Sequence, residues 1–212
     1  MLNILYQDRD LVVCVKPAGV MSQDSGAKSL PALLREQLAV KEVFAVHRLD
    51  KDVGGVMVYA LTQNAAAGLG RAVQDHRLEK VYQAILRGKP AEPSGKLEDL
   101  LFHDKTKNKT YVVTRQRKGV KDACLEYEVL RSGPDRTLVQ VRLHTGRTHQ
   151  IRVQFASRKL PLVGDGKYGG KEPGVPLCLW SAQLSFPHPV TRKTLTFTED
   201  PVWLGACEEW FT

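Results

Sequence analysis

The chain has 212 residues, of which 42% are hydrophobic and 25% are charged, so it can bury a sizeable core. This composition excludes a disordered polymer, and no apolar run reaches the length that a membrane-spanning helix needs. Lysine and arginine outnumber aspartate and glutamate by 31 to 23, which gives a net charge of +8 and a pI near 9.4. This excess slightly favours a nucleic-acid partner over a merely soluble surface, because each neutralised phosphate releases counterions. It does not distinguish RNA from DNA.

The N-terminal residues show no signal-peptide pattern, so we expect a cytoplasmic protein. The cysteines are scattered, without a CxxC pair or a histidine at metal-ligand spacing. We therefore expect neither zinc nor disulfides. Each cysteine is interpreted as a small buried side chain in a reducing compartment. They are Cys14, Cys124, Cys178 and Cys207.

The first eighty residues predict strands and two helices. Strand-like segments at residues 2–6 and 11–16 flank the turn QDRD and predict a β-hairpin. Residues 29–40 predict a helix, because four leucines share one face and Ser29 is a suitable N-cap. Two short strands and an alanine-rich helix follow, at residues 43–46, 56–60 and 62–76.

The rest of the chain is richer in strands. Residues 81–86 predict a strand that contains Tyr82. The strongly basic stretch 104–121 has few large hydrophobic side chains and predicts an exposed hairpin or loop. A third helix is predicted over residues 147–158. Further strands are expected at residues 125–129, 139–143, 177–184 and 194–197.

Many strands and few helices, without strict βαβ alternation, indicate an α+β protein with a mixed, mainly antiparallel sheet and flanking helices. The chain shows no internal repeat, no low-complexity tract and no linker. We therefore expect a single domain over residues 1–212.

The segment HRLDKDVGG, residues 47–55, places a carboxylate in a turn between two strands. Asp50 follows Arg48 by two residues, and the glycines allow a sharp turn or the close approach of a ligand. One interpretation is a carboxylate at the mouth of a cleft. The other is an exposed Asp50 paired with Arg48 or Lys51, which contributes little. Residue types alone favour the exposed pair.

The segment LHTGRTHQIRVQF, residues 143–155, gathers cations where a helix is expected to begin. Free backbone N–H groups at that start, together with Arg147, His149 and Arg152, predict an anion site. A simple phosphate-binding site competes here with a catalytic role.

Two further features are ambiguous by themselves. Tyr82 lies in a predicted strand, where a tyrosine is more often a core residue than a ligand-binding one. The segment PLVGDGKYGG, residues 161–170, contains four glycines and Asp165 and predicts a tight loop. It lacks the Lys-Ser/Thr ending of a phosphate-binding loop, so we do not expect nucleoside triphosphate binding.

Five motifs, taken in order, resemble the signatures of the RluA-type family of RNA pseudouridine synthases. The combination spans most of the chain and is far more specific than any one motif. The resemblance implies the pseudouridine synthase catalytic fold with a central RNA-binding cleft. It also implies conversion of uridine to pseudouridine in ribosomal or transfer RNA. The motifs are KPAGV (16–20), HRLD (47–50), EKVY (79–82), GRTHQIRV (146–153) and PLVGDGKYGG (161–170).

The resemblance also implies roles for individual residues. Asp50 matches the family's catalytic aspartate, and Arg152 matches the basic residue that keeps this carboxylate ionised. Tyr82 matches the aromatic residue that stacks on the target uracil. Arg48 matches the side chain that fills the space left by the extruded nucleotide. Three residues near Arg152 are implied to bind substrate: Arg147, His149 and Ile151.

The implied reaction breaks the bond between ribose and nitrogen 1 of uracil and joins the ribose to carbon 5 of the same base. Nothing is oxidised, so we expect no metal and no cofactor. A glycosidase would need two carboxylates at a set separation, and Asp52 is a poor second acid in such basic surroundings. A uridine in a folded RNA must first leave its stack, so structured RNA is the expected partner.

About fifteen residues precede Lys16, so we expect no accessory RNA-binding module ahead of the catalytic domain. RNA is then expected to bind the catalytic domain itself, aided by the basic stretch 105–121. Nothing in the sequence demands a protein partner or more than a monomer.

One departure keeps other hypotheses open. Family members usually carry Thr-Ser-Gly where this chain has Val53, Gly54 and Gly55, so two hydroxyl groups are missing. The alternative is a non-catalytic RNA-binding or ribosome-assembly factor on the same fold. A nucleoside hydrolase that acts on small molecules is disfavoured by the basic charge and the single motif carboxylate.

Overall fold

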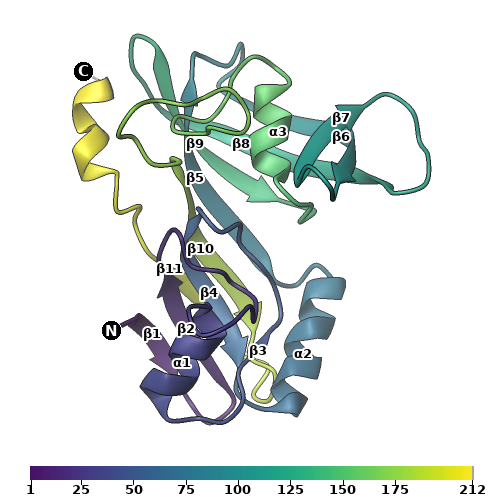
Figure 1. Cartoon of the computed structure of the whole chain (residues 1–212), viewed down its shortest axis with the longest axis vertical. Coiled ribbons are helices and arrows are strands. Elements are labelled where there is room, and N and C mark those ends of the chain that lie inside the picture. The colour runs from purple at the N-terminus through teal and green to yellow at the C-terminus, as the bar shows by residue number, and fades with distance from the viewer. Residues whose placement is uncertain (212) are drawn as a thin grey trace. The chain divides into compact units, whose positions relative to one another are not determined.

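A computed structural model of the chain describes residues 1–211 (Figure 1). These residues form eleven β-strands, three α-helices and a final 3-10 helix. They divide into two compact units, each built from two separate stretches of chain. Unit 1 comprises residues 1–80 and 180–201, and unit 2 comprises residues 81–179 and the chain from 202 onward. No helix among the described residues is long and apolar enough to cross a membrane.

The strands of unit 1 surround a parallel pair. β2 lies between β1 and β4 and is antiparallel to both, whereas β4 and β10 run parallel. β3 and β11 extend the arrangement antiparallel to β4 and β10. The bounds are β1 (Asn3–Gln7), β2 (Leu11–Lys16), β3 (Phe44–Ala45), β4 (Gly54–Ala60), β10 (Leu179–Pro187) and β11 (Thr194–Thr198).

Two helices complete unit 1, α1 (Leu30–Leu38) and α2 (Gln63–Gln74). α2 begins after a capping residue, because the Thr62 hydroxyl accepts the backbone N–H of Ala65 at 3.2 Å. The helix packs against the strands of this unit, where Ala65 and Leu69 join a buried cluster with residues of β2, β4 and β10 (Figure 1). Ser29 occupies the N-cap position of α1 without a side-chain capping bond.

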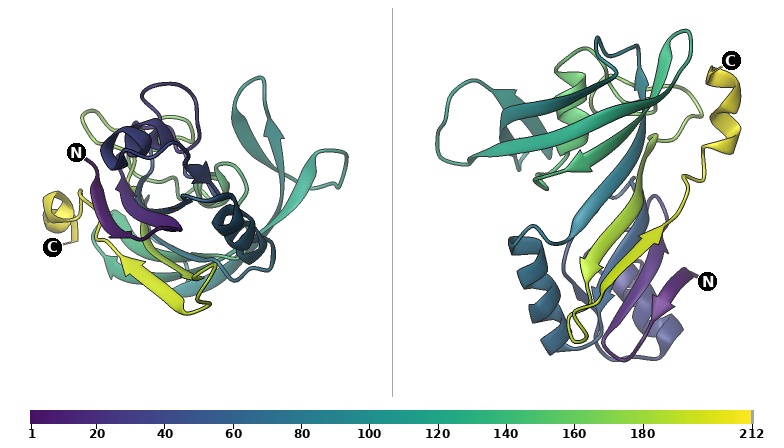
Figure 2. Two further views of the ribbon diagram at one scale, coloured as in Figure 1. Left: turned by 90° about the horizontal axis from the view of Figure 1, so that it is seen from below. Right: turned by 180° about the vertical axis from the view of Figure 1, so that it is seen from behind.

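Unit 2 is an antiparallel sheet in the order β5–β9–β8–β6–β7. The basic stretch forms the β6–β7 turn and the β7–β8 loop, which confirms the expected hairpin or loop. Figure 2 shows the β7–β8 loop extending past the strands that it joins. The bounds are β5 (Glu79–Arg87), β6 (Ser94–Asp104), β7 (Lys109–Val113), β8 (Val120–Ser132), β9 (Arg136–Leu143), α3 (Gln150–Ala156) and the 3-10 helix η1 (Gly205–Phe211).

The predicted α+β class with mainly antiparallel strands is confirmed. One helix boundary was wrong: α3 begins at Gln150, three residues after the predicted start at residue 147. The N-cap residue His149 has a left-handed backbone conformation with φ of 55°, which stops the helix from extending backwards.

Candidate functional site

In unit 1, predicted site residues lie on the turn that carries Asp50. The backbone of Leu49 exchanges two hydrogen bonds with the buried hydroxyl of Ser22, at 2.8 and 3.2 Å. The turn closes with a bond of 3.1 Å from the Val53 N–H to the Asp50 carbonyl. Leu49 is buried and Asp50 is half-buried, so the backbone is anchored while the carboxylate stays within reach of solvent.

Lys16 anchors the other side of this turn. Its side chain is fully buried, and the ammonium donates to the carbonyls of Pro17, Val20 and Lys51 at 3.0, 2.7 and 2.9 Å. Burial lowers the pKa of Lys16 to about 8, while the carboxylates of Asp52 and Asp50 oppose that shift. The three carbonyls use all three ammonium hydrogens, so Lys16 is a structural cation beside the carboxylate turn.

His47 and Arg48, at the start of the HRLD motif, differ in exposure. The Nε2 atom of His47 accepts the backbone N–H of Val58 at 3.2 Å. Burial and the nearby charge of Lys80 lower the pKa of His47 to about 3, so its ring is neutral at physiological pH. Arg48 is exposed.

The departure from the family pattern has a structural counterpart. A Cβ atom at Gly54 would lie 2.3 Å from Cζ3 of Trp180, 2.8 Å from its Cε3 and 3.0 Å from the Lys16 carbonyl. Trp180 is 3% exposed, and its indole N–H donates to the carbonyl of Glu199 at 2.9 Å, so the ring is fixed. The indole therefore fills the space that a serine side chain would need at position 54.

In unit 2, Arg152 lies on the first turns of α3. Its Nε and Nη2 atoms donate to the two carboxylate oxygens of Asp165 at 2.8 and 2.9 Å. The two side chains are 6% and 0% exposed, so this is a buried bidentate ion pair. A guanidinium with two of its donor groups fixed in this way has one defined orientation.

Tyr168 lies against Arg152 and His149. The Arg152 guanidinium carbon is 5.2 Å from the Tyr168 ring centroid. The Tyr168 hydroxyl accepts the backbone N–H of Thr110 at 2.8 Å and shares a 2.9 Å hydrogen bond with Nδ1 of His149. Burial raises the pKa of Tyr168, so the phenol stays protonated. Arg152 and His149 were both predicted as site residues, and both contact Tyr168, which was not predicted.

Arg147 does not join this group through the contacts defined in unit 2. Its Nε donates to the Asp122 carbonyl at 2.8 Å, and its backbone N–H donates to the side-chain oxygen of Gln150 at 3.0 Å. The Gln150 side chain also accepts from the Thr145 hydroxyl at 2.8 Å. The helix thus begins later than the predicted start near residue 147, and the Gln150 side chain accepts a backbone N–H there. The anion site itself stays a prediction.

The two remaining predicted residues of unit 2 are buried. Tyr82 is 5% exposed on β5, opposite Val141 of β9, and Ile151 is 4% exposed on α3. Charge in this unit is concentrated on the β6–β7 turn and the β7–β8 loop. The exposed cations there are Lys105, Lys107, Arg115, Arg117 and Lys118, and exposed Lys121 follows at the start of β8.

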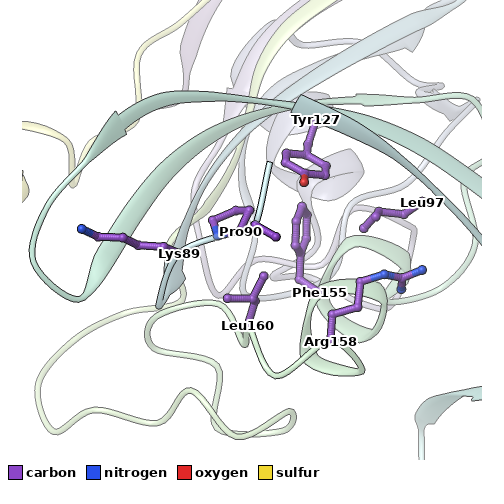
Figure 3. Close-up of a pocket in the computed structure, with 8 residues that line it drawn as sticks. Lys89, Pro90, Leu97, Tyr127, Phe155, Arg158 and Leu160 are labelled. Atoms are coloured by element: carbon purple, nitrogen blue, oxygen red, sulfur yellow. The ribbon is translucent and has the colours of Figure 1, made fainter. Parts of the chain in front are cut away.

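A separate hollow of about 400 Å³ also lies in unit 2, between α3 and the strands (Figure 3). Tyr127 and Phe155 meet edge to face within it, with ring centroids 5.6 Å apart. Arg158 at its rim is bound to Asp99 at 2.8 Å. None of the sequence-predicted site residues lines this hollow. Its lining residues are Lys89, Pro90, Ala91, Leu97, Tyr127, Phe155, Arg158 and Leu160.

One group of metal-binding residue types, Asp8, Asp10 and His188, occurs in unit 1. The Nδ1 atom of His188 accepts the backbone N–H groups of Val190 and Thr191, so its Nε2 carries the hydrogen that it donates to Asp8 at 2.8 Å. These bonds, and two from backbone N–H groups to Asp8, account for the cluster as a support of the turn before β2.

The sequence therefore missed four residues that hold the predicted ones. Lys16, Asp165 and Tyr168 lay inside motifs quoted for the family, but none of them was assigned a role. Ser22 gave no signal of its own. Their contacts join residues between 13 and 58 positions apart, which no local pattern reveals.

The predicted residues of each unit have chemistry suited to one task. Unit 1 supplies a carboxylate on a rigid turn, which can act as a nucleophile, stabilise a developing positive charge or move a proton. Unit 2 supplies a desolvated, oriented guanidinium, which favours the ionised form of an anion. The basic loops supply charge for binding a polyanion.

Comparison with known proteins agrees with this chemistry. Residues 10–157 match the family described as RNA pseudouridylate synthase. An uncharacterized RNA pseudouridine synthase of Aquifex aeolicus is 33% identical over 99% of this chain and 72% of its own length. Ribosomal large subunit pseudouridine synthase D of Vibrio cholerae is 34% identical over 92% of this chain and 66% of its own length. The chain thus spans slightly less than two thirds of that relative.

Solved structures show the same fold. Human RNA Pseudouridylate Synthase Domain Containing 1 superposes with a TM-score of 0.86 at 24% identity, covering all of this chain and 88% of its own. Human RNA Pseudouridylate Synthase Domain Containing 4 superposes with a TM-score of 0.82 at 25% identity, covering 99% and 92%. With a family match over most of its length and this fold, the chain belongs to the RNA pseudouridine synthases, a family of isomerases.

Proposed function

We propose that this protein converts specific uridines of ribosomal or transfer RNA to pseudouridine in the cytoplasm, with Asp50 as the catalytic carboxylate. The observation that carries the proposal is the turn at Asp50. Ser22 holds the residue before it and Lys16 holds the residue after it, so the carboxylate is anchored on both sides. Reacting groups gain most when they are held in one geometry.

In the proposed reaction the target nucleotide leaves its stack and enters the site. Arg48 fills the space that it vacates, and Tyr82 stacks on the uracil. Such stacking contributes about 1–3 kcal/mol per base toward the cost of extrusion. Arg152 keeps the catalytic carboxylate ionised, while Arg147, His149 and Ile151 contact the substrate.

The chemistry conserves the atoms of the base apart from one exchange of hydrogen. The bond from ribose carbon 1 to nitrogen 1 breaks, and a bond to carbon 5 forms. The hydrogen of carbon 5 leaves to solvent, and nitrogen 1 takes up a proton. No electrons are gained or lost, so the proposal requires no redox cofactor and no metal. The carboxylate has three possible roles: attack on the sugar, attack on the base, or stabilisation of charge with proton transfer.

The named relative from Vibrio cholerae acts on the large ribosomal subunit, which makes large-subunit RNA the first target to test. Transfer RNA is the second. The exposed cations of the β6–β7 turn and β7–β8 loop support an RNA partner for unit 2.

The decisive experiment is release of tritium from RNA labelled at carbon 5 of uracil. Wild-type protein should release tritium from one of the two RNA classes, and Asp50→Ala should release none while keeping RNA affinity within about threefold. Asp52→Ala is a matched control in the same turn and should remain active. No release by wild-type protein that still binds RNA would replace this proposal with the binding-factor hypothesis.

A further inference from the structure

The orientation of Arg152 depends on one short loop, residues 162–170. The loop brings the carboxylate of Asp165 to the guanidinium in a bidentate pair. That carboxylate is itself fixed, because its Oδ1 atom also accepts the backbone N–H groups of Lys167 and Tyr168 at 3.0 and 3.1 Å. Asp165 therefore cannot rotate away from Arg152 without breaking the loop's own hydrogen bonds.

The loop is closed too tightly to shift easily. A Cβ atom at Gly164 would lie 1.9 Å from the Pro176 carbonyl oxygen, and one at Gly170 would lie 1.8 Å from the Leu162 carbonyl oxygen. Gly164 also has a φ of +78°. The backbone is thus packed against its neighbours at both ends, with Asp165 and Tyr168 presented between them.

Tyr168 connects Arg152 with the β6–β7 hairpin. Its ring centroid lies 5.2 Å from the Arg152 guanidinium carbon and 5.4 Å from the Lys109 ammonium. Its hydroxyl accepts the N–H of Thr110, a buried residue of β7 whose own hydroxyl donates to the Thr148 carbonyl at 2.8 Å. The hairpin, the loop and the start of α3 are therefore joined at one phenol.

We propose that Asp165 and Tyr168 are positioning residues for the reaction: Asp165 sets the direction of the Arg152 guanidinium, and Tyr168 ties that direction to the β6–β7 hairpin. Neither residue needs to touch the substrate. The inference rests on the proposed function, since Arg152 affects catalysis only if the protein isomerises uridine.

A second aspartate–arginine pair, next to the same helix, provides a comparison. Asp99 binds Arg158 at 2.8 Å, beyond the C-terminal end of α3. The Arg158 side chain is 35% exposed, against 6% for Arg152, and none of its described contacts involves Tyr168 or the glycine-rich loop. Asp99→Asn therefore removes the same charge from the Asp99–Arg158 ion pair and leaves the contacts that hold Arg152 in place.

The test measures single-turnover tritium release at saturating RNA with the full-length protein. Asp165→Asn keeps the shape of the side chain but loses its charge and one acceptor, and the rate constant should fall about 100-fold, as expected for a misplaced group. Tyr168→Phe removes one hydroxyl and should lower the rate constant about 10-fold. RNA affinity should change less than threefold for both. Asp99→Asn and Tyr127→Phe should remain within twofold of wild type.

The pH profile separates positioning from simple loss of structure. A displaced guanidinium stabilises an ionised carboxylate less, so the acidic limb of the rate profile should move to higher pH in Asp165→Asn and Tyr168→Phe. In the two control variants the limb should stay in place. A loss of folded protein would lower the whole profile without moving it.

Wild-type rate constants in Tyr168→Phe would overturn the inference about the hairpin, and wild-type rates in both variants would overturn it entirely. A loss that disappears as RNA concentration rises would also overturn it, because it would assign these residues to binding. If Asp165→Asn does not fold, Tyr168→Phe decides alone. Failure of the proposed function is distinct, since wild-type protein would then release no tritium at all.

Discussion

The Nζ atom of Lys16 lies among three backbone carbonyls, with the carboxylates of Asp50 and Asp52 in its electrostatic range. A lysine is almost never fully buried unless its charge is compensated. Here the carbonyls belong to the segment after β2 and to Lys51, so one cation joins two pieces of chain 35 residues apart. The ammonium loses its hydration on burial, and its bonds to the carbonyls fix the position of the Asp50 turn.

Substitution of Lys16 should change how the free energy of unfolding depends on pH, because burial lowers the pKa of this lysine. The folded protein releases this proton near pH 8, whereas an unfolded lysine holds it until about pH 10.5. Between these values the unfolded state binds more protons, so this group's contribution to the free energy of unfolding rises with pH. Relative to Lys16→Met, the unfolding free energy of wild type should rise by up to about 3 kcal/mol across that window. Urea unfolding at pH 7 and pH 10.5 measures the difference, and a constant difference would contradict the prediction.

Candidate site residues could be predicted where they lie in a sequence motif that resembles the family's. Asp50, Arg48 and Arg152 were identified from the resemblance, and their roles stay predictions. The partners that fix them could not be read from the sequence. Ser22 looked like one serine among many, and its two bonds to Leu49 exist only because the chain folds back across 27 residues.

At the scale of elements, β4 and β10 make the unusual turn sequence possible. Gly54 of β4 pairs with Trp180 of β10, and the indole covers the glycine. A hydroxyl residue at position 54 would collide with a ring that is buried and hydrogen-bonded. Gly54 and Trp180 are therefore matched in size, since the indole fills the space that the glycine leaves open.

Gly54→Ser should lower the free energy of unfolding by about 1–3 kcal/mol, the usual effect of overpacking a core. The same change should be less harmful by at least about 1 kcal/mol when Trp180→Leu has already made space, a coupling that a double-mutant cycle measures. Gly70→Ser is the control, because a Cβ atom at that helical position meets nothing within 4 Å. Equal costs of Gly54→Ser in both backgrounds would show that Trp180 is not the obstacle.

Elements with a clear period were predicted well, and irregular ones were not. The hairpin β1–β2, helices α1 and α2, and strands β5 and β9 lie where alternation or a leucine face placed them. β6 was missed because SGKLEDLLFHD mixes charges and leucines without a clean period, and its pairing with β8 over nine residue pairs determines it. The start of α3 was misplaced because Gln150 and the left-handed His149 are not visible as stop signals.

At the scale of the whole molecule, the net charge of +8 is unevenly placed. The β7–β8 loop carries three exposed cations within four residues, Arg115, Arg117 and Lys118. Arg117 also lies 4.9 Å from the ring of Phe102, which holds the loop close to β6. A cluster of this density suits a phosphate backbone.

Replacing these three cations with alanine should weaken RNA binding and flatten its salt dependence. Each lost phosphate contact lowers the slope of log K against log salt concentration by about 0.7–0.9, so the triple variant should lose up to about 2–3 units of slope. Fluorescence anisotropy over a salt series measures it.

The control carries the same change of net charge on unit 1, through Lys28→Ala, Lys41→Ala and Lys193→Ala, all at exposed positions. A slope reduced equally in both triple variants would mean that overall charge, rather than the loop, attracts the RNA. An unchanged slope in the loop variant would remove the loop from the RNA-binding surface.

The chain was expected to form a single domain over residues 1–212. Two compact units are found within the described residues. Each consists of two segments, and the segments of the two units alternate along the chain. Whether they fold as one cooperative domain stays a prediction, and a single unfolding transition seen by probes in both units is the expected result.

This interleaving has a consequence for synthesis on the ribosome. β4 ends at Ala60, but the strand that pairs with its first residues begins at Leu179, 119 residues later. At about 5–20 residues per second, the nascent chain waits about 6–24 s for that partner. During this interval β4 presents backbone groups of an uncovered edge, the kind of surface on which chains aggregate. Unit 1 therefore stays incomplete until its second segment, residues 180–201, has been synthesised, which is after the first segment of unit 2 has left the ribosome.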